Sequence, residues 1–324
     1  MTKRVFSGIR ASGQIHLGNY FGAIKNWLAL QSKYDCYFAV VDYHSLTTPF
    51  VPKELKANIR NLILDYLATG VDLKKCHLII QSFVPQHTEL AWILASVTPL
   101  SWFERVPTYK EKAAEHAKEL TLGLLSYPAL MAADILLYQA ELVPVGLDQL
   151  PHIELTNQIA QRFNHRFGQT FLPVKALVQK DGARLMSLKD PRKKMSKTGD
   201  DGIALTDSAD TIRQKISRAV TDSGHEIKSG PDKPALTNLL TIFSLVTETS
   251  PEKLAQQYVG QGYAAFKKDL AEAVIAFLKP IQAKRKQLAK DEREIMAAIT
   301  QSSAEASMLA EKTLTRVRKS IGVR

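Results

Sequence analysis

Apolar positions in the first part of the chain follow two alternating patterns. The runs at 4–9, 35–42 and 76–82 are almost continuously apolar, which is typical of strands buried on both faces of a sheet. Between them, the stretches at 19–34 and 54–70 carry apolar residues at the spacing of one helix face. Strands that alternate with helices of this length predict parallel βαβ units.

The same alternation returns in the middle of the chain. A helix is predicted over 127–140, a strand over 141–146, and a further helix over 151–167 that begins at a proline. The predicted fold class is therefore α/β, with an open, doubly wound, Rossmann-like parallel sheet. Ligands bind such sheets beyond the carboxyl ends of the strands. This rule places three stretches on one rim of the sheet: 7–13, 42–45 and 146–149.

Two regions depart from this alternation. The segment at about 80–130 shows no convincing strand, and we expect it to be an insertion between two halves of the sheet. From about residue 205 the strand pattern fades, and helical stripes preceded by good N-cap residues replace it. We therefore predict a Rossmann-like catalytic domain at 1–200, including the insertion, and an α-helical domain at 201–324.

Composition narrows the class of protein only slightly. The longest apolar runs fall well short of a membrane span, and no apolar signal region follows the first methionine. The two cysteines, Cys36 and Cys76, lie in apolar runs and are expected to be buried thiols, so a cytoplasmic location and no membrane partner are predicted. The net charge of +11 fits either plain solubility or a polyanionic partner such as nucleic acid.

The bend after the first predicted strand, "GIRASGQIHLGNYFGAI" at 8–24, carries the first candidate chemistry. It lacks the GxGxxG of dinucleotide folds and the Lys-Ser/Thr of phosphate-loop ATPases. Gly13 and Gly18 allow close backbone approach, and the following helix N-terminus attracts anions. His16 and Asn19 can add hydrogen bonds to a polyphosphate. Taken alone, a tight turn with a buried histidine explains the stretch equally simply.

A second stretch, "DPRKKMSKTGDD" at 190–201, favours the phosphate-binding interpretation of the first. It is a lysine-rich segment between Pro191 and Gly199, which are natural limits of a mobile loop. Alone, such a loop is usually just solvated. Together, "HLGN" and "KMSKT" resemble the HIGH and KMSKS signatures of class I aminoacyl-tRNA synthetases, in the same order and around a split βαβ sheet.

The chain resembles bacterial-type tryptophanyl-tRNA synthetases over nearly its whole length. The blocks "SGIRASGQIHLGNYFGA", "YPALMAADILLYQAELVPVGLDQLPHIELT", "GARLMSL" and "KKMSKT" follow that family's order. The resemblance implies a homodimer that activates L-tryptophan with ATP and transfers it to tRNA(Trp). It also implies Mg²⁺ carried by ATP and no protein-bound metal, and the two distant cysteines argue against the iron–sulfur cluster of some relatives.

The choice of tryptophan is argued from one predicted helix face. Tyr127, Met131 and Asp134 share that face, and an aspartate within "MAADILLY" is costly to bury without a donor. An indole N–H is a donor only, so a carboxylate beside an apolar cleft would accept its hydrogen bond. An aspartate that reaches solvent or an arginine is the alternative. Tyrosyl-tRNA synthetases tend to carry glutamine at the position of Met131. The thioether of Met131 packs well against a large aromatic ring, which favours tryptophan over tyrosine.

The remaining site residues follow from the resemblance. It implies that Gln149 faces the amino acid, whereas His44 either lines that pocket or simply ends a strand. The ATP site is implied to contain Arg10, Ala11, Ser12, Gly18, Asn19, Gly146, Leu147, Asp148, Leu185, Lys194, Met195, Ser196, Lys197 and Thr198. The residues expected to stabilise the transferring phosphate are His16, Asn19, Lys194 and Lys197.

Three positions depart from the family pattern. Arg10 and Ala11 stand where glutamine and proline are usual, which puts the usual contact at position 10 in doubt, and Leu147 stands where many relatives are acidic. Thr198 keeps the hydroxyl of the commoner serine. Besides tyrosyl-tRNA synthetase, a small-molecule adenylyltransferase and a non-catalytic synthetase-like protein remain alternatives. The helical domain argues against the former, and the intact "KMSKT" and Asp134 argue against the latter.

Overall fold

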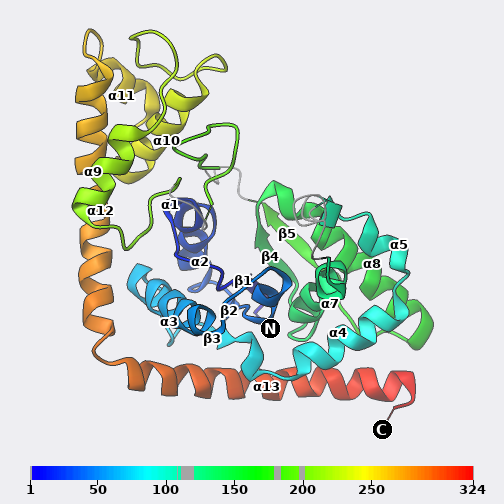
Figure 1. The fold of residues 1–324 in the computed structure, drawn as a ribbon. Helices are drawn as coiled ribbons and strands as arrows, with labels where there is room; N and C mark the ends of the chain where they lie inside the picture. Colours follow the sequence, from blue (N-terminus) through cyan, green and yellow to red (C-terminus); the bar gives the residue numbers. More distant parts are fainter. Residues whose placement is uncertain (1, 108, 111–119, 179–183, 197–200, 324) are drawn as a thin grey trace.

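A single five-stranded parallel sheet organises the molecule (Figure 1). The computed structural model describes residues 2–107, 109–110, 120–178, 184–196 and 201–323. The strand order is β3-β2-β1-β4-β5, and every pairing is parallel. The strands are β1 (Arg4–Ile9), β2 (Asp35–Val40), β3 (His77–Ile80), β4 (Leu142–Val145) and β5 (Lys175–Val178). The predicted doubly wound sheet is therefore confirmed, with its topological switch between β1 and β4.

The predicted helices are present, with shifted ends. The helix expected over 19–34 is a continuous run from α1 (Leu17–Asn19) through a π-helical turn (Tyr20–Ile24) to α2 (Lys25–Leu30). Helix α3 (Pro52–Thr69) ends at Gly70, whose φ of +114° suits the left-handed cap that glycine favours. The region of the predicted insertion and the chain after it form α4 (Gln86–Val97), α5 (Leu100–Glu104), α7 (Leu122–Leu136) and α8 (Leu150–Phe167).

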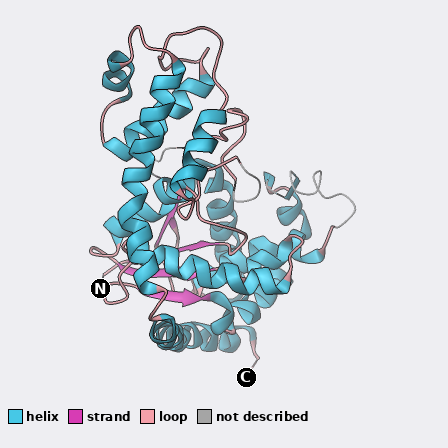
Figure 2. Ribbon diagram, turned by 60° about the vertical axis from the view of Figure 1, so that its left-hand side comes forward, coloured by secondary structure: helices cyan, strands magenta, loops and turns pink. Residues whose placement is uncertain are grey.

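Alternate residues of each strand feed two apolar cores, one on each face of the sheet (Figure 2). On one face Phe38 stacks on Trp27 at 4.5 Å between ring centroids, and helices α2 and α3 cover it. On the other face Phe6 stacks on Tyr138 at 5.6 Å, beneath α4, α7 and α8. Burial on both faces explains why these strands are almost continuously apolar in sequence.

The C-terminal helices pack against the sheet at two places. They are α9 (Ala209–Arg218), α10 (Pro234–Thr247), α11 (Pro251–Gln257), α12 (Tyr263–Leu288) and α13 (Glu292–Ile321). Arg285 of α12 forms an ion pair with the buried Asp65 of α3, at 2.6 Å. Helix α13 returns beneath β3 and α4 (Figure 1), where the Ser303 hydroxyl accepts from the Ile80 N–H at 3.3 Å. The division at residue 200 stays a prediction.

Within the described part of the chain, no helix has the length and apolarity that crossing a membrane requires.

Candidate active site

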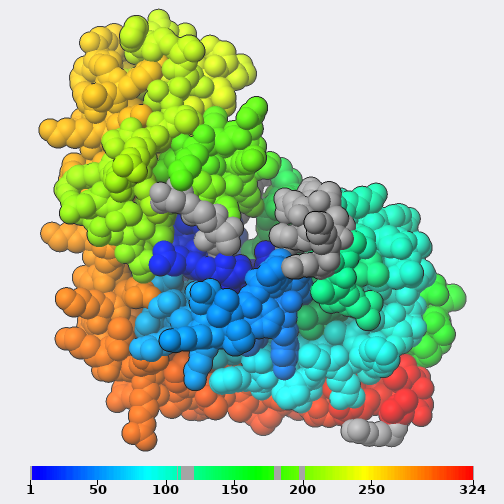
Figure 3. All heavy atoms as spheres, in the orientation of Figure 1, coloured from blue at the N-terminus to red at the C-terminus, as the bar shows by residue number. Residues whose placement is uncertain are grey.

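The two motif stretches meet at the carboxyl ends of the strands. The Leu17 N–H donates to the Ile203 carbonyl and the Leu205 N–H donates to the Ile15 carbonyl, each at 2.9 Å. An antiparallel bridge between His16 and Ala204 lies between these bonds. "HLGN" is thus paired with the chain that directly follows "KMSKT". In the space-filling view, this face is hollowed where the blue N-terminal residues meet the green segments (Figure 3).

The start of α1 is built around a buried histidine. His16 is 5% exposed, and its backbone N–H donates to the Asn19 side-chain oxygen at 3.3 Å. A Cβ atom at position 18 would lie 2.9 Å from two atoms of the His16 ring, so Gly18 is required for the ring to lie where it does. Leu185 lies on the other side of Gly18, 3.7 Å from the same Cβ position, and is itself buried.

The segment 185–195, which carries Lys194 and is called the arm below, is anchored by hydrogen bonds of its backbone. The Met195 N–H donates to the Leu185 carbonyl at 3.0 Å, and the Ser187 N–H donates to the Lys193 carbonyl at 2.8 Å. Asn238 of α10 binds both polar groups of the Met186 backbone, each at 2.9 Å. The arm therefore has a fixed base from which the exposed Lys194 side chain projects. Lys197 and Thr198 lie outside the described residues, and Ser196 is half-buried at their edge.

Opposite this arm, the turn after β4 presents a carboxylate. Lys194 Nζ lies 3.6 Å from Asp148 Oδ2, with 56% and 54% of the two side chains exposed. Burial raises the pKa of Asp148, but the hydrogen bond from Gln149 and the charge of Lys194 lower it overall. The Gln149 amide donates to Asp148 at 3.0 Å, so in this structure it points toward Asp148. Gly146 and Leu147 are exposed beside it.

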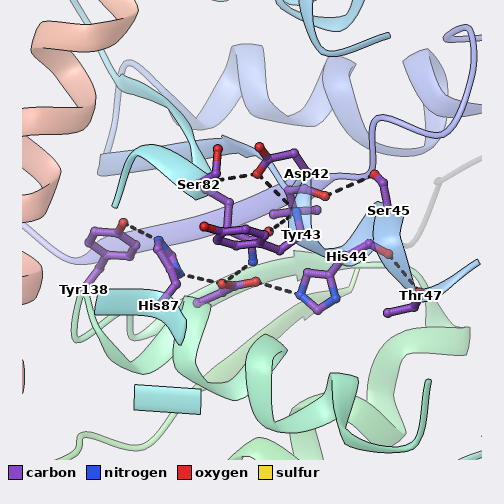
Figure 4. A network of polar contacts seen from close by, with 11 residues as sticks. Asp42, Tyr43, His44, Ser45, Thr47, Ser82, His87 and Tyr138 are labelled. Atoms are coloured by element: carbon purple, nitrogen blue, oxygen red, sulfur yellow. Dashed lines mark hydrogen bonds and ion pairs between the residues drawn. The ribbon is translucent and has the colours of Figure 1, made fainter. Parts of the chain in front are cut away.

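The candidate amino-acid pocket surrounds Asp134, which is only 2% exposed on α7. His44 Nε2 lies 2.9 Å from its Oδ2, while the Gln81 amide and His87 Nδ1 lie 2.7 and 2.6 Å from its Oδ1 (Figure 4). Burial alone would raise the pKa of this carboxyl, but the charges and hydrogen bonds of His87 and His44 lower it to about 2. Asp134 is therefore a fixed anion, bound by histidines and glutamine instead of solvent or arginine.

Aromatic and basic side chains complete this side of the rim. The Tyr127 hydroxyl lies 2.6 Å from His152 Nε2, and the Tyr127 ring meets His44 edge-on at 6.3 Å. Burial lowers the pKa of His152, which keeps that ring neutral. Burial also lowers the pKa of Arg10, and Tyr127 opposes this shift.

Three other residues assigned to the site from the sequence are Met131, Ala11 and Ser12. Met131 is half-buried one turn before Asp134 on α7, as the shared helix face predicts. Ala11 is buried and Ser12 half-buried in the bend after β1.

Three polar residues of this region belong to none of the sequence motifs: Gln81, His87 and Asn238. Gln81 follows β3 directly, so the rule for the carboxyl ends of strands could have found it. His87 lies in the polar first turn of α4 and Asn238 in an apolar stretch of α10, and no local spacing marks them as site residues.

Comparison with known proteins identifies the family. A family model described as tRNA synthetases class I (W and Y) matches residues 2–279. The tryptophan--tRNA ligase of Caldanaerobacter subterraneus subsp. tengcongensis is 46% identical over 325 residues, covering 99% of this chain and 98% of that protein. The chain belongs to the class I tRNA synthetases. Within them, it is a bacterial tryptophanyl-tRNA synthetase by similarity over its full length.

Solved structures agree with this assignment. The tryptophanyl-tRNA synthetase from Mycoplasma pneumoniae has a TM-score of 0.91 at 34% identity, covering 100% of this chain and 99% of that one. The enzyme from Campylobacter jejuni complexed with ADP and tryptophan has a TM-score of 0.86 at 33% identity, covering 99% and 100%.

The predicted activity, a tryptophan–tRNA ligase with a Rossmann-like fold, is thereby confirmed. Tyrosyl-tRNA synthetase and the small-molecule adenylyltransferase are set aside.

Proposed function

We propose that the two sides of this rim divide the work of tryptophan–tRNA ligation. The pocket around Asp134 selects L-tryptophan, and the stretches "HLGN" and "KMSKT" bind ATP and stabilise the phosphate that reacts. The observation that carries this division is the buried carboxylate of Asp134, held by His44 and Gln81, which is separate from the exposed pair of Lys194 and Asp148. The similar Campylobacter jejuni structure is described as a complex with ADP and tryptophan, which supports both halves of the proposal.

Selection of the amino acid rests on one hydrogen bond. The indole N–H of tryptophan donates to the Asp134 carboxylate, while Met131 and Tyr127 pack against the ring. His44 holds one carboxylate oxygen at 2.9 Å, so the oxygen does not rotate away from the pocket. Gln149 is proposed to reach the amino acid after releasing Asp148, to which it donates in the structure. A site built around a specific donor rejects analogues that lack it by powers of ten.

Activation joins tryptophan to the nucleotide. A carboxylate oxygen of tryptophan attacks the α-phosphorus of ATP, and the bond to the pyrophosphate oxygen breaks as pyrophosphate leaves with its Mg²⁺. No general base is needed, because the attacking carboxylate is already ionised near neutral pH. The proposed positively charged and hydrogen-bonding groups around the phosphates are Lys194, Lys197, His16 and Asn19. The adenylate then passes its acyl group to the terminal ribose hydroxyl of tRNA, releasing AMP.

Residues on both sides of the phosphates are proposed to hold the nucleotide. Gly146 and Asp148 are proposed to contact the ribose, with Leu147 between them at the ATP site, and a backbone group of Leu185 is proposed to contact the adenine. The remaining proposed ATP contacts are Arg10, Ala11, Ser12, Gly18, Met195, Ser196 and Thr198.

Partners beyond the small substrates are proposed from charge and exposure. The net charge of +11 suits tRNA(Trp), whose anticodon we assign to the helical segment at 201–324. Trp92 and Leu122 are 74% and 75% exposed within the predicted insertion, which supports a homodimer formed through that region. Cys36 and Cys76 are buried and free, and burial raises the pKa of each thiol to about 12, in keeping with a cytoplasmic enzyme.

The test is amino-acid-dependent exchange of pyrophosphate into ATP, measured with each of the twenty amino acids, followed by charging of tRNA(Trp). Exchange with tryptophan alone is expected, and exchange with tyrosine instead would overturn the selector role of Asp134. The variant Lys197→Ala should lower exchange about ten- to a thousand-fold, the loss of one charged contact to the reacting phosphate. Lys193→Ala, which removes a neighbouring exposed lysine, serves as its control; equal rates in both variants contradict the role of Lys197.

A further inference from the structure

A relay of buried polar groups extends from the Asp134 carboxylate away from the pocket (Figure 4). We infer that His87 and Tyr138 are positioning residues for tryptophan recognition, which orient the Asp134 carboxylate so that one oxygen is left for the indole N–H. The inference rests on the proposed role of Asp134 as the tryptophan selector. Neither His87 nor Tyr138 is proposed to touch a substrate, because both act through Asp134.

The two nitrogens of the His87 ring are each held at a fixed place. Nδ1 lies 2.6 Å from Asp134 Oδ1 and, because an ionised carboxylate only accepts, carries a proton. Nε2 lies 2.8 Å from the Tyr138 hydroxyl, a group that can both donate and accept. Whichever of the two donates, Tyr138 fixes the plane of the His87 ring, and the ring in turn fixes Asp134 Oδ1.

Gln81 is fixed in the same manner from the opposite side. The Tyr43 backbone N–H donates to its side-chain oxygen at 3.0 Å, so the oxygen cannot face Asp134. The Gln81 amide nitrogen consequently donates to Asp134 Oδ1 at 2.7 Å. Oδ1 is thus in contact with two side-chain nitrogens, from Gln81 and His87, whereas Oδ2 is in contact with one, from His44. Because a carboxylate offers about four acceptor positions, the remaining position on Oδ2, on the side of His44, is left for the indole N–H.

Packing holds the far end of the relay rigid. His87 is fully buried, and the Tyr138 ring is stacked against Phe6 at 5.6 Å and Tyr37 at 4.7 Å, both from the strands of the sheet. A tyrosine clamped between two strand residues cannot swing its hydroxyl away without moving the sheet. The orientation of the carboxylate in the pocket is thereby tied to the most rigid part of the fold.

The test compares tryptophan with an isosteric analogue that carries sulfur in place of the indole N–H. The measured quantity is the ratio of kcat/KM for the two compounds in pyrophosphate exchange. The ratio should fall about ten-fold in Tyr138→Phe and about a hundred-fold in His87→Leu, with the KM for ATP unchanged. His87→Asn, whose amide nitrogen lies near the place of Nδ1, should restore most of the ratio. Tyr258→Phe removes a comparable hydroxyl bond to Asp269, at 2.8 Å, and should leave it unchanged.

The outcomes distinguish a failure of the positioning role of His87 and Tyr138 from a failure of the selector role of Asp134. If Tyr138→Phe and His87→Leu slow both compounds equally, the two residues are merely structural and the inference is overturned. If Asp134→Ala also leaves the ratio unchanged, the selector role itself fails. A collapse of the ratio in Asp134→Ala alone would retain the selector and reject the relay. Tyr138→Phe keeps the test decisive even where His87→Leu does not fold, because it removes a single oxygen from a ring that stays packed.

Discussion

The amino-acid pocket and the phosphate rim lie on the same edge of the sheet, yet they hold their charges in opposite ways. Asp134 is 2% exposed and lies within 2.9 Å of three side-chain nitrogens, from His44, Gln81 and His87. Lys194 and Asp148 are each more than half exposed and are joined by a single contact of 3.6 Å. One side is organised before substrate arrives, and the other is held loosely.

This difference matches the chemistry that each side performs. A buried carboxylate with fixed partners discriminates by position, because an analogue without the matching donor leaves a buried charge unsatisfied. An exposed ion pair is worth only about 0–1 kcal/mol, so ATP phosphates can displace Asp148 from Lys194 at small cost. Selection therefore depends on rigidity, whereas phosphate binding depends on charges that remain free to rearrange.

The largest effect is expected from removing the buried charge. Asp134→Ala should lower kcat/KM for tryptophan roughly a thousand-fold or more, because three buried donors lose their acceptor together with the indole N–H. The KM for ATP should stay within about two-fold, since the phosphate rim contacts none of these groups. Steady-state pyrophosphate exchange measures both. A comparable rise in both KM values would show that the two sides are not independent.

The amino-acid side also shows where sequence patterns succeed and where they stop. Asp134 could be selected as a candidate because a carboxylate within an apolar helix needs a donor, which is a local argument. That Gln81 and His87 contact Asp134 could not be predicted, because both lie on other elements, and Gln81 is 53 residues away in the chain. Contacts of that separation depend on how the sheet is assembled, and a single sequence does not carry them. The same holds for the ion pair between Arg285 of α12 and Asp65 of α3, two helices far apart in the chain.

For the fold, buried strands were predictable, including the four-residue edge strand β3, and one exposed edge strand was not. The strands at 4–9 and 35–42 were visible because both faces are buried, and β1 and β2 match them closely. Strand β5 (Lys175–Val178) was missed: it has four residues, pairs on one side only and is partly exposed, so it has neither a long apolar run nor a clear alternation.

The second prediction concerns the phosphate rim at its most crowded point. Gly18→Ala would place a Cβ 2.9 Å from the His16 ring and displace it from the start of α1. Pyrophosphate exchange should fall about a hundred-fold, as when a preorganised charge-stabilising group is lost. Gly22→Ala is the matched control four residues later, where a Cβ meets nothing within 4 Å. Equal activity of the two variants would remove His16 from the phosphate site.

A smaller effect is expected from loosening the arm that carries Lys194. Asn238→Ala removes both hydrogen bonds to the Met186 backbone, and should raise the KM for ATP about ten-fold with little change in the KM for tryptophan. Thr241→Ala, which removes a hydroxyl bond within the same helix, is the control. If Asn238→Ala instead raises the KM for tryptophan, the arm supports the amino-acid pocket and the contrast between the two sides is weaker than we describe.

The smallest effect is expected from the exposed ion pair of the phosphate rim. Asp148→Asn removes the charge that faces Lys194, and an exposed pair of this kind should change the free energy of unfolding by less than about 1 kcal/mol. Denaturant unfolding measures this change, and it should shrink further at high salt because the pair is open to screening. Asp65→Asn, which breaks the buried pair with Arg285, provides the contrast and should cost about 3–5 kcal/mol. A comparable loss in both variants would mean that Lys194 and Asp148 are locked together, and ATP would then have to break a structural contact before it could bind.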